Sequence, residues 1–374
     1  MKFKSIAAAC MAFAVLFTST AFAAQPAKDE KIVLTYDKAV ELATKNNTKL
    51  STLEDSIDYM EKNQEITVES MGSTAAMMSD PETRTMTMQM GNLLTSAQTL
   101  ETNIQTSKYN KDLIKIGNEY LVKNYFNGIK LAESGLELAK KNASIAQDKY
   151  NQDIVKSRLG MVSKNDLQTS KSAFDTSRNT VEQTELAIEK TYDSMKTALG
   201  IDTSKEVEID YEISYEPYEL GRSIESYITT SISKAPSIKI AEANLDLAKR
   251  LKNISTYETA VYSYLEKENN VSSASRNVKD AKDNMKTNIT NAYNDIKTLE
   301  TERESLETAL KDAKTTYETA KTNYAVGNVT SLTLKQAELG VENAENNLVT
   351  NAYNHDLKVF AFNNPSILGS SNWF

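Results

Sequence analysis

The residues best suited to chemistry in this sequence are methionines that recur at every second position, Met86, Met88 and Met90. Their thioether sulfurs are soft ligands that suit Cu(I). Methionine clusters also form adaptable apolar surfaces that contact a partner or a membrane. We interpret this run, together with Met77 and Met78, as a contact surface of the second kind, and we predict no bound metal.

Side chains for nucleophilic or metal-assisted catalysis are scarce. His355 is the only histidine, and Cys10, the only cysteine, lies within the first 23 residues, which we expect to be removed. The mature chain would then have neither a Cys-His pair nor a usual zinc site. No glycine-rich loop suggests phosphate binding. Carboxylates are abundant, but on polar helical faces they are usually surface charges. The sequence therefore predicts a protein that is not an enzyme and holds no cofactor.

The first 23 residues have the pattern of a secretory signal peptide. Lys2 and Lys4 precede an apolar run over 6–17, and Ala21-Phe22-Ala23 is a small-x-small cleavage site. Cys10 stands too early in the apolar run for a lipoprotein signal. We expect cleavage after Ala23, export to the cell envelope, and a mature chain without disulfides.

Net charge and hydropathy narrow the possible functional classes of this protein further. The net charge of −8 comes without a basic block, which argues against nucleic-acid binding. No later segment approaches the roughly 18 consecutive apolar residues of a membrane helix.

The sequence after the predicted signal peptide contains an internal duplication. The segment from Tyr150 through Gly160 to Leu167 repeats 167 residues later, with Gly327 in place of Gly160. After each glycine, large side chains recur at intervals of seven. They are Leu167, Phe174, Val181, Ile188 and Met195, then Leu334, Val341, Leu348, His355 and Phe362. Such a repeat places these side chains along one side of a helix, and we call this line of residues, which packs against a neighbouring helix, the seam. The fold class is therefore all-α, with duplicated long antiparallel coiled-coil hairpins.

The duplication predicts the domain organisation. We expect a first helical repeat over 24–201, with its tip near 160, and a second over 222–362, with its tip near 327. A strand and linker over 202–221 join them, and 363–374 form a C-terminal tail. The strand is predicted from the apolar–polar alternation of Val207–Tyr215.

Finer boundaries follow from the positions of proline, glycine and polar residues. Residues 24–33 read as an extended leader and Thr35 as a helix N-cap. The next long helix is expected to end near Ile66, before a methionine-rich insertion over 67–91 that includes a short strand or hairpin tip at Thr85–Met90. Further helices are expected over 93–156 and 164–199, and at 223–235 and from Pro236 in the second copy. A turn is expected at Asn269–Ser273.

Three features together resemble the outer membrane efflux protein family, which is TolC-like. They are the segment Leu34–Asn47, which reads LTYDKAVELATKNN, the doubled Tyr…Gly…Leu tip, and the strand between the copies. The resemblance covers nearly all of the mature chain. It implies a homotrimer whose hairpins form a hollow helical tube for efflux or type I secretion. Its tips would dock a periplasmic adaptor, or membrane fusion protein, joined to an inner-membrane transporter.

The resemblance also implies roles for individual residues. The adaptor-docking tips would comprise Arg158, Leu159, Gly160, Met161 and Val162, with Ala325, Val326, Gly327, Asn328 and Val329. The inner mouth would be narrowed one or two turns further on, by Asp166, Thr333 and Gln336. The two glycines would also end helices in any such hairpin.

One departure from the family leaves an alternative open. The family inserts a pair of long membrane strands in each repeat. At the corresponding place this sequence has only residues 67–91 in the first repeat and almost no extra residues in the second. We therefore expect little or no β-barrel. The alternative is an exported coiled-coil protein with a structural role in the cell envelope and no channel. The methionine-rich segment would then be a distal tip that contacts a membrane or a partner.

Overall fold

The computed structural model describes residues 31–77, 84–254 and 261–368. The predicted signal peptide, Met78 and the last six residues lie outside these ranges.

Helices dominate the described ranges, and two short strands accompany them. The helices are α1 (Tyr36–Lys45), α2 (Thr48–Met77), α3 (Arg84–Arg158), α4 (Lys164–Leu199), α5 (Ile224–Lys234), α6 (Pro236–Ile254), α7 (Val261–Ala325) and α8 (Ser331–Asn363), followed by the 3-10 turn η2 (Pro365–Ile367). The strands are β1 (Ile32–Thr35) and β2 (Val207–Asp210).

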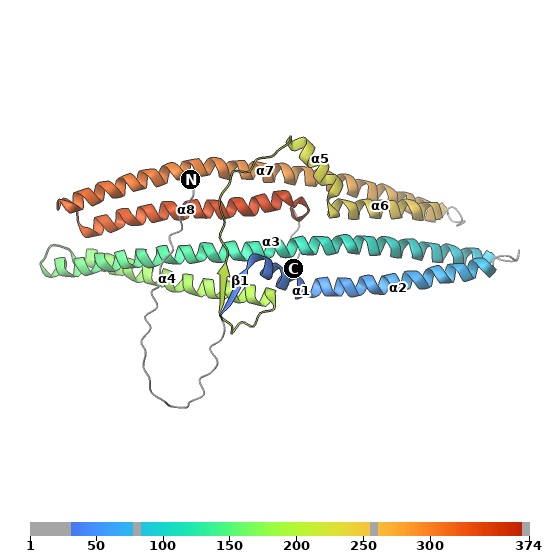
Figure 1. Ribbon diagram of the computed structural model, residues 1–374, viewed down its shortest axis with the longest axis horizontal. Coiled ribbons are helices and arrows are strands. Elements are labelled where there is room, and N and C mark those ends of the chain that lie inside the picture. The colour runs from blue at the N-terminus through green and yellow to red at the C-terminus, as the bar shows by residue number, and fades with distance from the viewer. Residues whose placement is uncertain (1–30, 78–83, 255–260, 369–374) are drawn as a thin grey trace, which may run out of the picture.

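Each half of the chain consists of one long helix with a shorter helix packed along each end (Figure 1). In the first half α3 packs against α2 and α4, and in the second half α7 packs against α6 and α8. The 75 residues of α3 span about 110 Å at about 1.5 Å per residue. The α3–α4 and α7–α8 turns lie at one end of the molecule, and the α2–α3 and α6–α7 pairs reach the other (Figure 1). The predicted all-α fold of duplicated hairpins is confirmed.

The seven-residue repeat marks the packed seam of each hairpin. Of the repeat residues on α4, Met195 is buried and the other four are half-buried, and Ser170, three residues after Leu167, is buried too. On α8, His355 and Phe362 of the repeat are buried, as are Ala344 and Asn351 between the repeat positions. Small residues between the large ones allow the two helix backbones to approach closely, as in a coiled coil.

Large apolar side chains are buried mainly around the middle of the molecule, in two clusters. One gathers Leu34, Phe126 and Leu199 around α1 and the adjoining parts of α3 and α4. The other gathers Ile289 and Phe362 between α5, α6, α7 and α8. Full burial of such side chains stabilises a fold by about 1.5–3 kcal/mol each. In these two clusters the short helices α1 and α5 pack against the long helices α3 and α7.

The strands correct one prediction and shorten another. The predicted extended leader ends at Val33 and the predicted N-cap is Thr35, whereas Ile32–Thr35 form β1, which pairs in parallel with β2. Ile32 lies opposite Val207, and Leu34, opposite Ile209, is fully buried. The predicted strand over 207–215 ends at Asp210. The pairing joins residues 175 apart, which no local pattern reveals.

Three predicted local features are wrong, each because a helix continues through it. The helix expected to end near Ile66 runs on to Met77. Residues 85–90, expected as a strand or hairpin tip, lie in α3. Asn269–Ser273, expected as a turn, lies within α7. Alternation and asparagine content are weak local preferences, and packing of α3 on α2 and of α7 on α6 overrides them. In the described ranges, no helix has both the length and the apolar character needed to cross a membrane.

Candidate functional site: the two hairpin tips

The first tip is a compact turn set by one glycine. After α3 ends at Arg158, Gly160 adopts φ +72°, and the N–H of Met161 donates to the carbonyl oxygen of Lys156 at 2.8 Å. This is a helix C-terminal motif in which a left-handed residue lets the chain satisfy the last carbonyls. Ser163 then caps α4, accepting the Asp166 N–H at 3.1 Å.

The second tip repeats this geometry. Gly327 adopts φ +78°, and the N–H of Asn328 donates to the carbonyl oxygen of Asn323 at 2.8 Å. Thr330 caps α8 by accepting the Thr333 N–H at 3.2 Å. The prediction that both glycines end a helix in the left-handed conformation is confirmed.

Large apolar side chains point into solvent at both tips. Leu159 is 69% exposed, Met161 70% and Val326 67%. Val162 and Val329, at equivalent positions, are both half-buried. Because both tips lie at the same end of the molecule (Figure 1), these residues give that end an apolar surface beside the exposed Arg158 and Asn328. Such a surface can bind a partner.

Neither glycine is required by close packing. A Cβ atom added at Gly160 or at Gly327 would meet nothing within 4 Å. Glycine is therefore required at both positions only because of the positive φ, which residues with a Cβ atom rarely adopt.

The residues predicted to narrow the inner mouth have a local role in the structure. Asp166 accepts a hydrogen bond from the hydroxyl of Ser163 at 2.7 Å, and Thr333 lies 3.0 Å from Thr330 Oγ1. Both occupy the third position of their helix, where such side chains complete an N-terminal cap, and the Asp166 charge favours the helix dipole. Gln336 is exposed one turn further on. A constriction at these residues stays a prediction.

The two hairpins differ at a pair of neighbouring positions close to the tip. Asp153 of α3 is buried beside Ser170 of α4, and Lys149 donates to its Oδ2 at 3.0 Å. Burial raises the pKa of Asp153, but the hydrogen bonds from Lys149 and Ser170 outweigh it and hold that pKa below its ordinary value. At the same offset of 167 the second hairpin carries Ala320 and Ala337. A residue-by-residue comparison of the two copies could have found this difference.

At the other end of the molecule, the methionine-rich segment is helical where it is described. Met77 is the last residue of α2, and Met86, Met88 and Met90 lie in the first turns of α3. Exposed apolar side chains further along α2 include Ile66. Contact with a membrane or a partner stays a prediction.

His355 is packed inside the second repeat and is 4% exposed. Its Nε2 lies 3.4 Å from Oε1 of Glu300, and its ring centroid lies 4.9 Å from that of Tyr215 in the linker. The histidine thus holds the linker against α7 and α8. Within the described ranges, no group of three or more histidine, cysteine or carboxylate residues could hold a metal ion.

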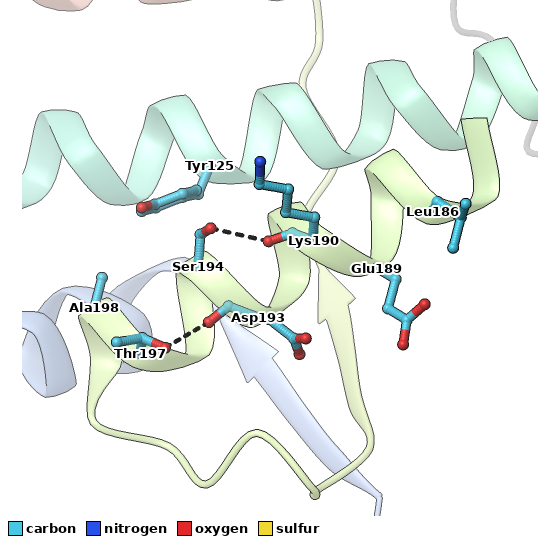
Figure 2. Close-up of a pocket in the computed structure, with 8 residues that line it drawn as sticks. All are labelled: Tyr125, Leu186, Glu189, Lys190, Asp193, Ser194, Thr197 and Ala198. Carbon is cyan, nitrogen blue, oxygen red and sulfur yellow. Dashed lines mark hydrogen bonds between the residues drawn. The ribbon is translucent and has the colours of Figure 1, made fainter. Parts of the chain in front are cut away.

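A shallow groove of about 620 Å³ lies between α3 and α4 (Figure 2). Its serine and threonine hydroxyls are engaged with their own helix, since Ser194 donates to the Lys190 carbonyl at 2.9 Å and Thr197 to that of Asp193 at 2.8 Å. Leu186 is exposed at the edge. This face of α4 is therefore an open helix surface without an activated nucleophile. Its lining residues are Tyr125, Leu186, Glu189, Lys190, Asp193, Ser194, Thr197 and Ala198.

Comparison with protein-family models finds no match, and comparison with curated protein sequences finds none. Solved structures match over most of the chain. A membrane protein from Pseudomonas aeruginosa has a TM-score of 0.65 at 12% identity, over 88% of this chain and 93% of that one. The outer membrane protein VceC from Vibrio cholerae has a TM-score of 0.63 at 10% identity, over 88% and 96%. The Campylobacter jejuni CmeC outer membrane channel has a TM-score of 0.60 at 15% identity, over 90% and 87%. The predicted TolC-like fold is thereby confirmed.

Proposed function

We propose that the chain is an exported duct component of an efflux or type I secretion system. In this proposal three copies assemble into a helical tube in the cell envelope. Their tips dock a periplasmic adaptor that is joined to an inner-membrane transporter. The observation that carries the proposal is the pair of equivalent tips at one end of the molecule, with Leu159, Met161 and Val326 exposed. The likeness in fold to outer membrane channels supports it.

The remaining predicted residues take roles within this duct. Asp166, Thr333 and Gln336 would narrow the mouth next to the tips. Only Asp166 is acidic, so selectivity for cations does not follow. The methionine-rich end, including Met77, Met78, Met86, Met88 and Met90, would contact a membrane or a partner.

A second candidate is a structural coiled-coil protein of the cell envelope without a channel. The observation that favours it is the small extent of strand, since β1 and β2, the strands of the described ranges, have four residues each. The two candidates differ in whether the tips bind an adaptor.

Tip binding is tested by charge substitutions that leave the fold intact. Leu159→Asp with Val326→Asp places carboxylates on both tips, and because both side chains are exposed we expect no loss of stability. Binding to a purified adaptor from the same cell should weaken more than about tenfold, since apolar anchors dominate such interfaces. The matched control is Leu186→Asp with Ile66→Asp, also at exposed apolar positions but away from the tips. Equal binding by both double variants would contradict adaptor docking at the tips.

A further inference from the structure

A groove of about 520 Å³ lies between α7 and α8 and is closed on one side by Tyr120 of α3. Leu299 and Leu357 supply apolar lining, and Asn291 and Asn354 contribute exposed amides. The Tyr120 ring is fixed there by stacking on Phe360, with 6.2 Å between ring centroids. The groove therefore combines apolar walls and amide groups of the second repeat with one aromatic ring of the first. Asp295 and Lys358, which form an ion pair with each other, line it as well.

The described chain ends at the wall of this groove. Leu368 is itself a lining residue, and its carbonyl oxygen accepts a hydrogen bond from Asn288 Nδ2 at 3.1 Å. Just before it, Ser366 and Ile367 of η2 are buried, and η2 contacts α3, α7 and α8. Leu368 is extended, with φ −70° and ψ 120°. The residues that follow therefore start from an anchored point on the groove.

Those residues, 369–374, read Gly-Ser-Ser-Asn-Trp-Phe. They carry no charged side chain, and six extended residues reach about 20 Å. Two aromatic rings match the apolar walls, and the serine and asparagine side chains match the amides of Asn291 and Asn354. We propose that residues 369–374 fold back into this groove of their own chain, with the Trp373 ring against the apolar wall. The segment then joins α3 of the first repeat to α7 and α8 of the second.

This inference is independent of the duct function. A second copy of the chain is the competing occupant, because its own Trp373 and Phe374 have the same chemistry. The segment of the same chain is favoured because Leu368 already holds it at the groove, which makes its binding intramolecular and raises its effective concentration.

The single tryptophan makes the test direct, because all tryptophan fluorescence comes from Trp373. In a chain with Cys10→Ser, which removes the only cysteine, Asn354→Cys is labelled with a nitroxide, a short-range quencher. The matched control is Asn343→Cys, also exposed on α8 and about 16 Å away along the helix. We expect emission blue-shifted from that of free tryptophan amide, and strong quenching from position 354 but weak quenching from 343.

Three outcomes would overturn the proposal. One is emission like that of free tryptophan amide, and another is equal quenching from both positions. The third is quenching that arises when labelled Trp373→Phe chains are mixed with unlabelled chains, which would assign the groove to a second copy. As a second readout, ending the chain after Leu368 should lower the melting temperature, whereas Ser371→Ala should not.

Discussion

Lys123 of α3 lies 2.7 Å from Asp356 of α8, so an ion pair joins the two repeats at the middle of the molecule. The hydroxyl of Tyr211, in the linker, donates to the same carboxylate at 3.2 Å. The Lys123 ammonium also lies 5.7 Å from the ring centroid of Tyr36. Both repeats and the linker thus meet at one charged group.

Removing one member of this pair should destabilise the fold. Asp356→Ala leaves Lys123, which is only 13% exposed, without a carboxylate partner, and we expect a loss of about 1–3 kcal/mol in the free energy of unfolding. Asp295→Ala is the control, because its ion pair with Lys358 is about half exposed and should contribute at most about 1 kcal/mol. Urea denaturation measures both. Equal losses would show that Lys123 and Asp356 do not hold the repeats together.

Glu300 should make stability depend on pH. Burial raises its pKa, but the hydrogen bonds from Lys297 at 2.6 Å and from the Tyr218 N–H at 2.7 Å outweigh it, so the pKa lies below the ordinary 4.5. A carboxyl whose pKa is lowered by folding contributes stability above its unfolded pKa, and that contribution is lost as pH falls through the folded pKa.

Glu300→Gln should therefore melt below the unaltered chain at pH 7, and the difference should shrink as the pH is lowered through and below 4.5. Melting curves across this range measure it. A difference that stays constant with pH would mean that the Glu300 charge does not stabilise the fold.

The sequence predicted what depends on local and periodic signals. The ends of α4 at Lys164 and Leu199 were predicted from the Gly160 tip before the helix and from Gly200 after it, and the packed face was predicted from the seven-residue repeat. Long-range partners could not be predicted, because Lys123 and Asp356, like β1 and β2, meet only through tertiary packing. The same limit hid the partner of His355, whose position in the seven-residue repeat was predicted but whose contact with Glu300 was not.

The tip glycines should resist substitution through backbone strain alone. Gly160→Ala and Gly327→Ala force alanine to positive φ and should each cost about 1 kcal/mol. Gly128→Ala, in the middle of α3 with open space around it, should instead stabilise the chain by up to about 1 kcal/mol. Chemical denaturation distinguishes the two signs. Stabilisation by all three substitutions would contradict the strained turn at the tips.

The polar pair of the first hairpin should behave as a unit. The Ser170 hydroxyl donates to the Leu167 carbonyl oxygen at 3.1 Å and also helps to lower the pKa of the buried Asp153 carboxyl. Ser170→Ala should therefore cost about 1 kcal/mol. Asp153→Ala with Ser170→Ala reproduces the Ala320 and Ala337 pair of the second hairpin and should cost less than the sum of the single changes. A double-mutant cycle measures the coupling, and strict additivity would mean that the two side chains do not interact.

The central claim is that three chains form one tube, and the mass of the mature protein in solution tests it most directly. Light scattering, with and without detergent, should give three chain masses. A requirement for detergent would support membrane contact at the methionine-rich end. A single chain mass at every accessible concentration, in both conditions, would contradict the tube and favour a structural coiled-coil protein.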